Sequence, residues 1–462
     1  MPSDCSPDVV SPVPFADAAR VWTRVGLQSF GGPAGQIAIM HRILVEERRW
    51  ISESRFLHAL NYCMLLPGPE AQQLATYIGW LLHGYRGGLV AGVLFVLPGF
   101  LAILALSVLY ALYQSAAPVA ALFFGLKAAV LAIVVVAGLR IGRRVLKNGA
   151  MQFIAAGAFV AIFFLDVPFP VIVLGAAVIG LAGERLMPAA FRIAPGHGSG
   201  GDDAASAGTV ADVLERYPPP HTQPSRQRAL RVVLVCGFLW GVPVDVLFSV
   251  LGPGHVLTDE SLFFSKAAVV TFGGAYAVLA YIAQQAVERY AWLLPGEMLD
   301  GLGMAETTPG PLIMVVQFVG FMGAYRYPGN LDPMLAGVLG SIVTTWVTFV
   351  PCFLWIFLGA PFMESLRGNH RLNAALSAIT AAVVGVIVNL SAWFALHTLF
   401  GVIDDRRVGP IRLLVPEMQT IDLLAVALSI GAFVALFRFR AGMMATLVGT
   451  TTLGALAKMV LV

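Results

Sequence analysis

The sequence contains little charge, because Asp, Glu, Lys and Arg together make up only 12% of its 462 residues. A soluble globular protein carries about 25% charged residues. Spans 87–114, 334–363 and 372–398 contain no Asp, Glu, Lys or Arg. Each is longer than the roughly 20 residues that a helix needs to cross a bilayer. This shortage of charge excludes a soluble fold and predicts a polytopic membrane protein.

Several other signals are missing. The four cysteines show no Cys-x-x-Cys or Cys/His spacing, which excludes a typical zinc site or disulfide framework. The first fifteen residues lack the basic start and apolar core of a cleaved signal peptide. A net charge of +3 is too small to indicate nucleic-acid binding. Without a Walker sequence, ATP does not drive this chain. No flavin, haem or metal motif supports a membrane enzyme, so no cofactor and no metal are expected.

Two short motifs are present twice, 242 residues apart, since position 30 pairs with 272 and position 67 with 309. They are the Phe-Gly-Gly motif at 30–32 and 272–274 and the Pro-Gly-Pro motif at 67–69 and 309–311. The same separation pairs Arg24 with Lys266, Glu46 with Glu288 and Trp50 with Trp292. A constant separation over so many positions indicates an internal duplication.

We predict an all-α fold with two inverted repeats of about six helical segments each, broken or re-entrant at the motifs. In the first repeat the segments are hairpins 17–48 and 52–84 and helices 87–114, 117–146, 150–165 and 169–188. One extra crossing between the repeats turns the second upside down, giving about thirteen crossings. The predicted units are a disordered N-terminus (1–15), the first repeat (16–190), a polar linker (191–228), the extra helix (229–251) and the second repeat (258–462).

The distribution of basic residues predicts that the N-terminus and the linker are cytoplasmic and the C-terminus periplasmic. The cluster of Arg406, Arg407 and Arg412 lies on the predicted periplasmic side, where Asp404, Asp405 and Glu417 partly offset it. This loop is a mild violation of the positive-inside rule.

Longer sequences around the motifs are similar to a known family. They are FGGPAGQIAIM (30–40), RRWISESRFLHALNYCMLLPGPEAQQLATYIGW (48–80), and TFGGAYAVLAYI and TTPGPLIMVVQFVGF in the second half. The chain resembles the long, two-domain form of the chromate ion transporter family. The resemblance implies proton-motive-force-driven efflux of chromate across the bacterial inner membrane, and thereby chromate resistance. A transporter of sulfate or another oxyanion is an alternative, a passive anion channel is an alternative of another class, and a homodimer is left open.

The motifs suit an oxyanion because a helix that restarts after a proline has free backbone N–H groups and a partial positive charge. Glycine lets the backbone approach an ion closely. Close helix packing or kinking is the competing explanation. The predicted substrate-binding residues are Arg24, Phe30, Gly31, Gly32, Pro67, Gly68, Pro69, Gln72, Lys266, Phe272, Gly273, Gly274, Thr308, Pro309, Gly310 and Pro311.

Charged residues near the motifs complete the predicted site. Arg24 and Lys266 are predicted to supply full positive charge, although each could instead reach a membrane interface. Glu70 and Glu306 are candidates for carrying a coupling proton, and Glu70 could instead stabilise the start of a helix. Weaker substrate candidates are Lys127, Asn61, Gln73 and Gln317, whose polar groups could also join helices together.

Overall fold

The computed structural model describes residues 13–191, 220–272, 275–362 and 370–461. The first repeat contains α1 (Phe15–Gln28), α2 (Gly32–His41), η1 (Arg42–Glu47), α3 (Glu53–Cys63), α4 (Glu70–Tyr113), α5 (Ala117–Val145), α6 (Gly149–Phe163), α7 (Phe169–Leu186) and α8 (Pro188–Phe191). Then come η2 (Pro220–Thr222), α10 (Arg226–Leu251), α11 (Val256–Val270), α12 (Ala275–Gln284), η3 (Gln285–Arg289), α13 (Glu297–Thr307), η4 (Leu312–Met314), α14 (Val315–Arg326), α15 (Pro333–Gly359) and η5 (Ala360–Phe362). The chain ends with α17 (His370–Leu399), β1 (Ile403–Val408), β2 (Ile411–Pro416), η6 (Met418–Thr420), α18 (Leu423–Phe437) and α19 (Met443–Leu461).

The helices confirm an all-α polytopic membrane fold. Within the described residues, seven helices are long and apolar enough to cross a bilayer, and three shorter apolar helices accompany them. Helix α4 is two helices joined at a break, because His83 and Gly84 leave helical geometry and Gly84 has a φ of +61°. This break lies where the second predicted hairpin ends and the helix 87–114 begins. The count of thirteen crossings, the inverted orientation and the unit boundaries stay predictions.

The helices around the motifs are short. Helices α1, α2, α3, α11, α12, α13 and α14 contain between 10 and 15 residues. Since each residue adds 1.5 Å, even 15 residues reach only about 22 Å, less than the roughly 30 Å of a bilayer core. Each repeat also has a π-helical turn, η1 or η3, followed by a residue with positive φ, Arg49 or Ala291. These two residues are 242 positions apart, as the duplication predicts.

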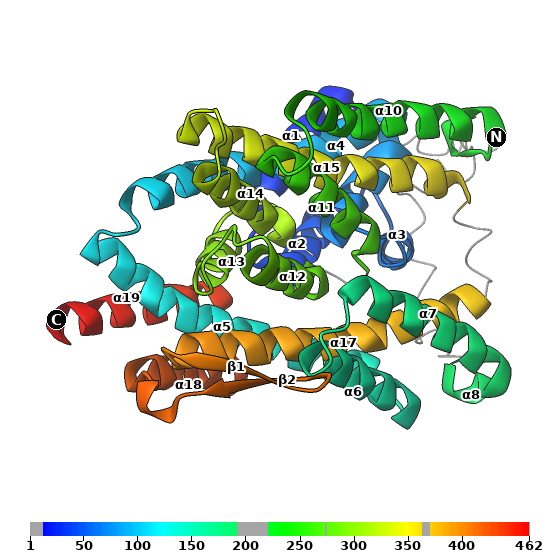
Figure 1. The fold of residues 1–462 in the computed structure, drawn as a ribbon. Coiled ribbons are helices and arrows are strands. Elements are labelled where there is room, and N and C mark those ends of the chain that lie inside the picture. Colours follow the sequence, from blue (N-terminus) through cyan, green and yellow to red (C-terminus); the bar gives the residue numbers. More distant parts are fainter. Residues whose placement is uncertain (1–12, 192–219, 273–274, 363–369, 462) are drawn as a thin grey trace, which may run out of the picture.

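The helices form two layers (Figure 1). One layer holds α10, α15 and the helices around the motifs, which are α1 to α4 and α11 to α14 and are called the motif helices. The other layer holds α5, α6, α7, α17, α18 and α19. Helix α13 packs on α5 and α12 packs on α17, so these two pairs join the layers. A large buried apolar cluster extends across both layers, and a second cluster fills the space among the first-repeat motif helices. Figure 1 shows α8 at one end of the long helices and the end of α19 at the other.

A β-hairpin follows α17 and was not predicted. Strands β1 and β2 pair antiparallel, from Ile403 opposite Pro416 to Val408 opposite Ile411. The turn contains Gly409, whose φ is +62°, followed by a proline. A Gly-Pro pair is a turn signal, but the four charged residues of β1 conceal the strand that precedes it.

Some predictions fall on residues that the structure leaves out. Most of the predicted linker and of the N-terminus 1–15 lies outside the described residues, as do Gly273 and Gly274. Helix α10 begins at Arg226, three residues before the predicted extra helix.

Candidate functional site

The two repeats exchange matched hydrogen bonds at their motifs. The Gly68 N–H in the first Pro-Gly-Pro donates to the Thr271 carbonyl, 2.8 Å away, directly before the second Phe-Gly-Gly. The Gly310 N–H in the second Pro-Gly-Pro donates to the Ser29 carbonyl, 2.9 Å away, directly before the first Phe-Gly-Gly. Both donors and both acceptors are pairs separated by 242 residues. Each Pro-Gly-Pro therefore contacts the Phe-Gly-Gly region of the other repeat, and we call this region the motif crossing.

The two residues whose carbonyls accept these hydrogen bonds, Ser29 and Thr271, also have matched side-chain hydrogen bonds. The Ser29 hydroxyl donates to the Val25 carbonyl at 2.6 Å, and the Thr271 hydroxyl donates to the Ala267 carbonyl at 2.6 Å. Both hydroxyls bond back one turn at the ends of α1 and α11, and both Ser29 and Thr271 are buried. Such back-bonding occupies the side chain locally. It leaves the backbone carbonyl of each residue for the glycine of the other repeat.

The glycines at the crossing cannot be replaced freely. Gly68 has a φ of +127° and Gly310 a φ of +100°, a region that side chains other than glycine rarely adopt. A Cβ on Gly310 would lie 3.0 Å from the Gly99 Cα, which is backbone. A Cβ on Gly68 would lie 2.7 Å from Gln73 Nε2 and 2.9 Å from Cys352 Sγ. The backbone segments at Gly310 and Gly99 therefore pass each other at nearly the closest distance that backbones allow, whereas Gly68 is enclosed by side chains.

Glutamine side chains join the crossing to the backbone. Gln36 Nε2 donates to the Gly310 carbonyl at 2.7 Å and Gln73 Nε2 to the Pro67 carbonyl at 2.7 Å. Gln317 Nε2 donates to the Phe100 carbonyl at 2.9 Å, and Gln72 Nε2 to the Thr76 hydroxyl at 3.0 Å. All four are buried. The sequence analysis missed Gln36, although it lies within the first motif sequence.

A buried carboxylate of the second repeat faces the first Phe-Gly-Gly. Glu306 is fully buried, and the Tyr276 hydroxyl donates to its Oε1 at 2.6 Å. Its Oε2 has no hydrogen-bond partner among the described residues. A Cβ on Gly32 would lie 3.6 Å from this oxygen. The structure thus places one of the predicted proton carriers beside Gly32 and adds Tyr276, which the sequence analysis did not name.

The helix starts after each Pro-Gly-Pro have no side-chain cap. Pro69 is the N-cap of α4 and Pro311 the N-cap of η4, and neither start receives a side-chain hydrogen bond. Glu70, the first residue of α4, is half-buried. The first N–H groups of a helix have no partner within it and carry a partial positive charge. Each Pro-Gly-Pro at the crossing is therefore followed by an uncapped start, that of α4 or that of the three-residue η4 that leads into α14, and the free N–H groups there suit an anion.

The predicted cations lie away from the crossing. The Arg24 side chain is 43% exposed and pairs with Glu47 at 2.9 Å, and Lys266 is exposed. Lys127 pairs instead with Asp300 on α13 at 3.3 Å. Asn61 is exposed, and Thr308 is buried with its hydroxyl 3.5 Å from the Ala305 carbonyl. The substrate roles of all five stay predictions.

A second charged group lies on α13 and was not predicted. The Tyr110 hydroxyl donates to the same Asp300 Oδ2 that Lys127 contacts, at 2.8 Å, and Asp300 is buried. One turn earlier, the buried Glu297 binds Arg326 through both oxygens at 2.6 and 2.5 Å. Because Lys127 belongs to α5, its ion pair holds the two layers together.

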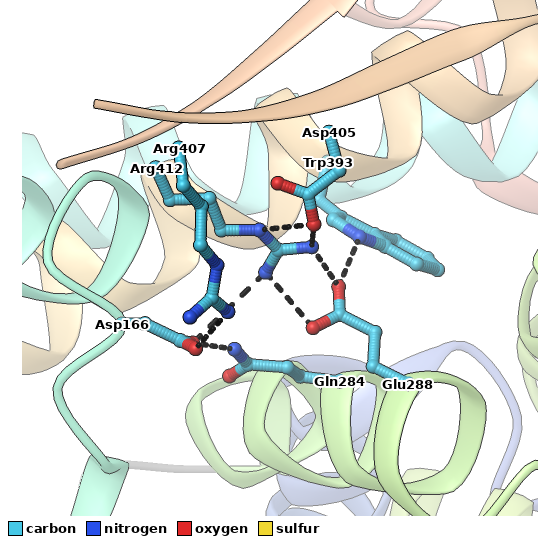
Figure 2. A network of polar contacts seen from close by, with 7 residues as sticks. All are labelled: Asp166, Gln284, Glu288, Trp393, Asp405, Arg407 and Arg412. Atoms are coloured by element: carbon cyan, nitrogen blue, oxygen red, sulfur yellow. Dashed lines mark hydrogen bonds and ion pairs between the residues drawn. The ribbon is translucent and has the colours of Figure 1, made fainter. Parts of the chain in front are cut away.

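Another set of polar contacts joins the layers near the β-hairpin (Figure 2). Arg412 of β2 donates to both oxygens of Glu288 at 2.9 and 3.0 Å and to Asp405 at 3.0 Å. We call the residues drawn in Figure 2 the Arg412 network: Asp166, Gln284, Glu288, Trp393, Asp405, Arg407 and Arg412. Burial lowers the pKa of Arg412, but its hydrogen bonds and charge interactions with Glu288 and Asp405 raise it overall. Arg412 therefore keeps its charge at every physiological pH, and the unpredicted hairpin fastens to η3.

Replacing Arg412 by alanine is expected to lower the free energy of unfolding by about 1–3 kcal/mol, because it leaves the part-buried Glu288 and the exposed Asp405 without their charged donor. The measurement is thermal unfolding of the purified protein in detergent. Arg406→Ala is the matched control, since Arg406 is 66% exposed and pairs with Asp404 in its own strand. Equal unfolding temperatures for the two variants would contradict a role of the Arg412 network in joining the layers.

Long apolar helices, two repeats with broken helices and a polar crossing between them define a polytopic membrane protein built like a secondary transporter. The chromate transporter family matches residues 16–181 and 259–456, and the chain belongs to this family. A chromate transport protein of Pseudomonas aeruginosa is 31% identical over 82% of this chain and 80% of its own length. A probable chromate transport protein of Synechococcus elongatus is 27% identical over 80% of this chain and 81% of its own. A chromate transport protein of Cupriavidus metallidurans is 26% identical over 79% and 78%. No solved structure matches the chain.

Proposed function

We propose that the protein exports chromate from the cytoplasm across the bacterial inner membrane, driven by the proton-motive force, and so confers chromate resistance. The observation that carries this proposal is the motif crossing, with its two uncapped helix starts. The identity of the substrate is inferred from the relatives, which are named chromate transport proteins.

Partial charges suit this task better than a cluster of fixed cations. A dianion needs donors and positive potential inside the membrane, yet it must leave again on the other side. Free N–H groups at the two helix starts supply hydrogen-bond donors and a partial positive charge. Because this charge is only partial, the anion can leave again. Arg24 and Lys266, which lie exposed at matched positions, are proposed to attract the anion before it reaches the crossing.

The membrane potential favours export. Moving one elementary charge through 100 mV is worth about 2.3 kcal/mol, and a dianion gains roughly twice this amount. With the cytoplasm negative, this energy drives chromate outward. A proton enters the cycle through a carboxylate near the substrate, for which Glu306 and Glu70 are the proposed groups. An ionised Glu306 would repel a dianion beside Gly32, so we propose that a proton taken up from the periplasm neutralises Glu306 while the anion is bound. This proton is then released to the cytoplasm, so that proton and anion move in opposite directions.

The proposed orientation places the N-terminus and linker in the cytoplasm and the C-terminus in the periplasm. Two observations support inverted repeats. The matched hydrogen bonds are those expected of two units related by a twofold axis. The ends of α8 and α19 lie at opposite ends of the long helices (Figure 1).

Everted membrane vesicles test the function, because export appears there as uptake. We expect labelled chromate to accumulate in energised vesicles that contain the protein and not in vesicles from cells without it. Collapsing the proton-motive force should stop accumulation. If sulfate is taken up in preference, the protein is a sulfate transporter. If chromate flux continues unchanged down its own gradient after the collapse, the protein is a channel.

A further inference from the structure

A second fully buried carboxylate lies far from the motif crossing. Glu260 is in the second turn of α11 and has an exposed fraction of 0%. It precedes Thr271 by eleven residues, about 16 Å along the helix. Neither of its carboxylate oxygens accepts a hydrogen bond of normal geometry from the described residues, although the backbone of Ala324 lies close enough to interact with the carboxyl group. A membrane-embedded carboxylate without a partner points to a functional group.

Glycines of two neighbouring helices make room for this carboxylate. A Cβ on Gly323 of α14 would lie 2.7 Å from Glu260 Oε1, and a Cβ on Gly340 of α15 would lie 3.0 Å from Oε2. One turn further along α15, the buried Thr344 hydroxyl also lacks a partner and lies against Gly320. The space between α11, α14 and α15 is therefore shaped around an acidic side chain, with a second unpartnered polar group one turn further along α15.

The fold does not need a carboxylate at this position. The residue 242 positions earlier, in the first repeat, is Ala18, and it is buried at 3% exposure in α1. The same helix of the first repeat thus packs with a methyl group. The glutamate is a special feature of the second repeat.

Few charges are available to stabilise an ionised Glu260. The ionisable residues on the packed elements are Asp259 and Lys266 on α11, Tyr325 and Arg326 on α14, Cys352 on α15, and Arg226, Arg228, Arg231, Cys236 and Asp245 on α10. Lys266 is exposed and lies six residues, about 9 Å, further along α11. The arginines of α10 are in its first turns, whereas its last turns contact the start of α11, where the Thr258 hydroxyl donates to the Leu247 carbonyl at 3.2 Å. Asp259 is itself acidic and opposes ionisation. Arg326 is bound by both oxygens of Glu297. A carboxylate that is removed from water without a cation is kept in its neutral, protonated form.

We propose that Glu260 is a proton-binding site of the transport cycle, separate from the motif crossing. The carboxylate binds one proton and holds it while α11 is packed on α14 and α15. When α11 moves away from these helices, water reaches the carboxylate and the proton leaves as hydronium. This inference rests on the proposed function, because it assigns a coupling proton to a transporter.

Transport in everted vesicles tests the site with three variants. Glu260→Gln imitates the protonated side chain, Glu260→Ala installs the residue of the first repeat, and Glu417→Gln removes an exposed carboxylate as the control. At a fixed membrane potential, an imposed pH gradient should stimulate chromate transport in the wild type and in the control. We expect both Glu260 variants to lose this stimulation while their KM for chromate changes less than twofold.

A chemical readout does not depend on transport. Dicyclohexylcarbodiimide enters membranes and reacts with protonated, buried carboxyl groups, and mass spectrometry of peptides locates the adduct. We expect Glu260 to be labelled at low pH and progressively less as the pH rises, and Glu417 to stay unlabelled.

The outcomes separate the inference from the proposed function. Full stimulation by the pH gradient in Glu260→Gln, or stimulation by a sodium gradient in its place, would overturn the proton site. Absence of labelling at every pH would do the same. If the wild type does not transport chromate but Glu260 shows pH-dependent labelling, the proposed function fails and the proton site stands.

Discussion

Replacing Gly310 by alanine should abolish chromate transport while the protein still reaches the membrane. The added Cβ meets the backbone of Gly99 at 3.0 Å, and the φ of +100° is strained for alanine. Strain of this kind costs about 1–3 kcal/mol, which corresponds to roughly a tenfold to hundredfold loss of the correct arrangement. The measurement is initial uptake into everted vesicles, normalised to the amount of protein in the membrane.

Alanine substitutions at two further glycines serve as comparisons for the effect of Gly310→Ala. Gly237→Ala in α10 is the control, because a Cβ there meets nothing within 4 Å, and it should transport normally. Gly68→Ala should be less severe than Gly310→Ala, since one neighbour is the movable end of the Gln73 side chain. Normal transport by Gly310→Ala would mean that the motif crossing tolerates a side chain and does not hold the substrate as proposed.

Replacing Glu306 by glutamine should remove the dependence of chromate affinity on pH and prevent accumulation against a gradient. In the wild type, a lower pH should lower the KM, because a proton on Glu306 removes a negative charge beside the bound dianion. Glutamine is neutral at every pH, so the KM of the variant should stay constant. Because one charge interaction is worth about 1.4 kcal/mol or more inside a protein, this constant KM should be at least about tenfold below the wild-type value at high pH. Uphill accumulation should be lost, because glutamine cannot bind and release a proton.

Tyr276→Phe offers a graded comparison for this prediction. It removes the hydroxyl that donates to Glu306 at 2.6 Å but keeps the carboxylate. Its KM should still vary with pH, over a shifted range. Glu417→Gln again serves as the exposed control. A KM for Glu306→Gln that varies with pH as in the wild type would exclude Glu306 as the group that exchanges with the anion and would leave Glu70.

The effects of Glu306→Gln and Glu260→Gln should differ. The first carboxylate lies beside Gly32 at the crossing, whereas the second lies far along α11. The first variant should therefore change the KM and the second only the response to the pH gradient. Assays of both variants under the same conditions would show whether the cycle uses one proton site or two.

Much of the fold could be predicted because the helices and their breaks depend on the residues within each segment. Long uncharged segments must be helices in a bilayer, and they were found within a few residues of the predicted positions. The breaks at the motifs were predicted from glycine and proline, which act on their own backbone. The duplication was visible because both copies kept the same spacing. The structure repeats it even in the positive φ of Arg49 and Ala291.

The site could be predicted only in part because its contacts are not local. The pairing of Gly68 with Thr271 joins residues about 200 positions apart, and no pattern in either segment selects its partner. Asp300, Tyr276 and Glu260 lie in apolar helices where a single polar residue indicates no particular neighbour. Arg24 and Lys266 were chosen for their matched positions, yet their exposure shows that a shared register does not determine burial. The β-hairpin was missed because β1 is short and four of its six residues are charged, so it carries little strand signal.

The matched hydrogen bonds between the repeats also bear on the order of synthesis. When the first repeat enters the bilayer, the Ser29 carbonyl and the Gly68 amide have no partner, because Gly310 and Thr271 are translated more than 200 residues later. Unpaired backbone groups are costly in hydrocarbon. The nascent first repeat must therefore stay hydrated, bind the insertion machinery or remain loosely packed. The two hydrogen bonds of the motif crossing form only when the second repeat has been inserted, so the first repeat reaches its final structure only after the second has entered the membrane.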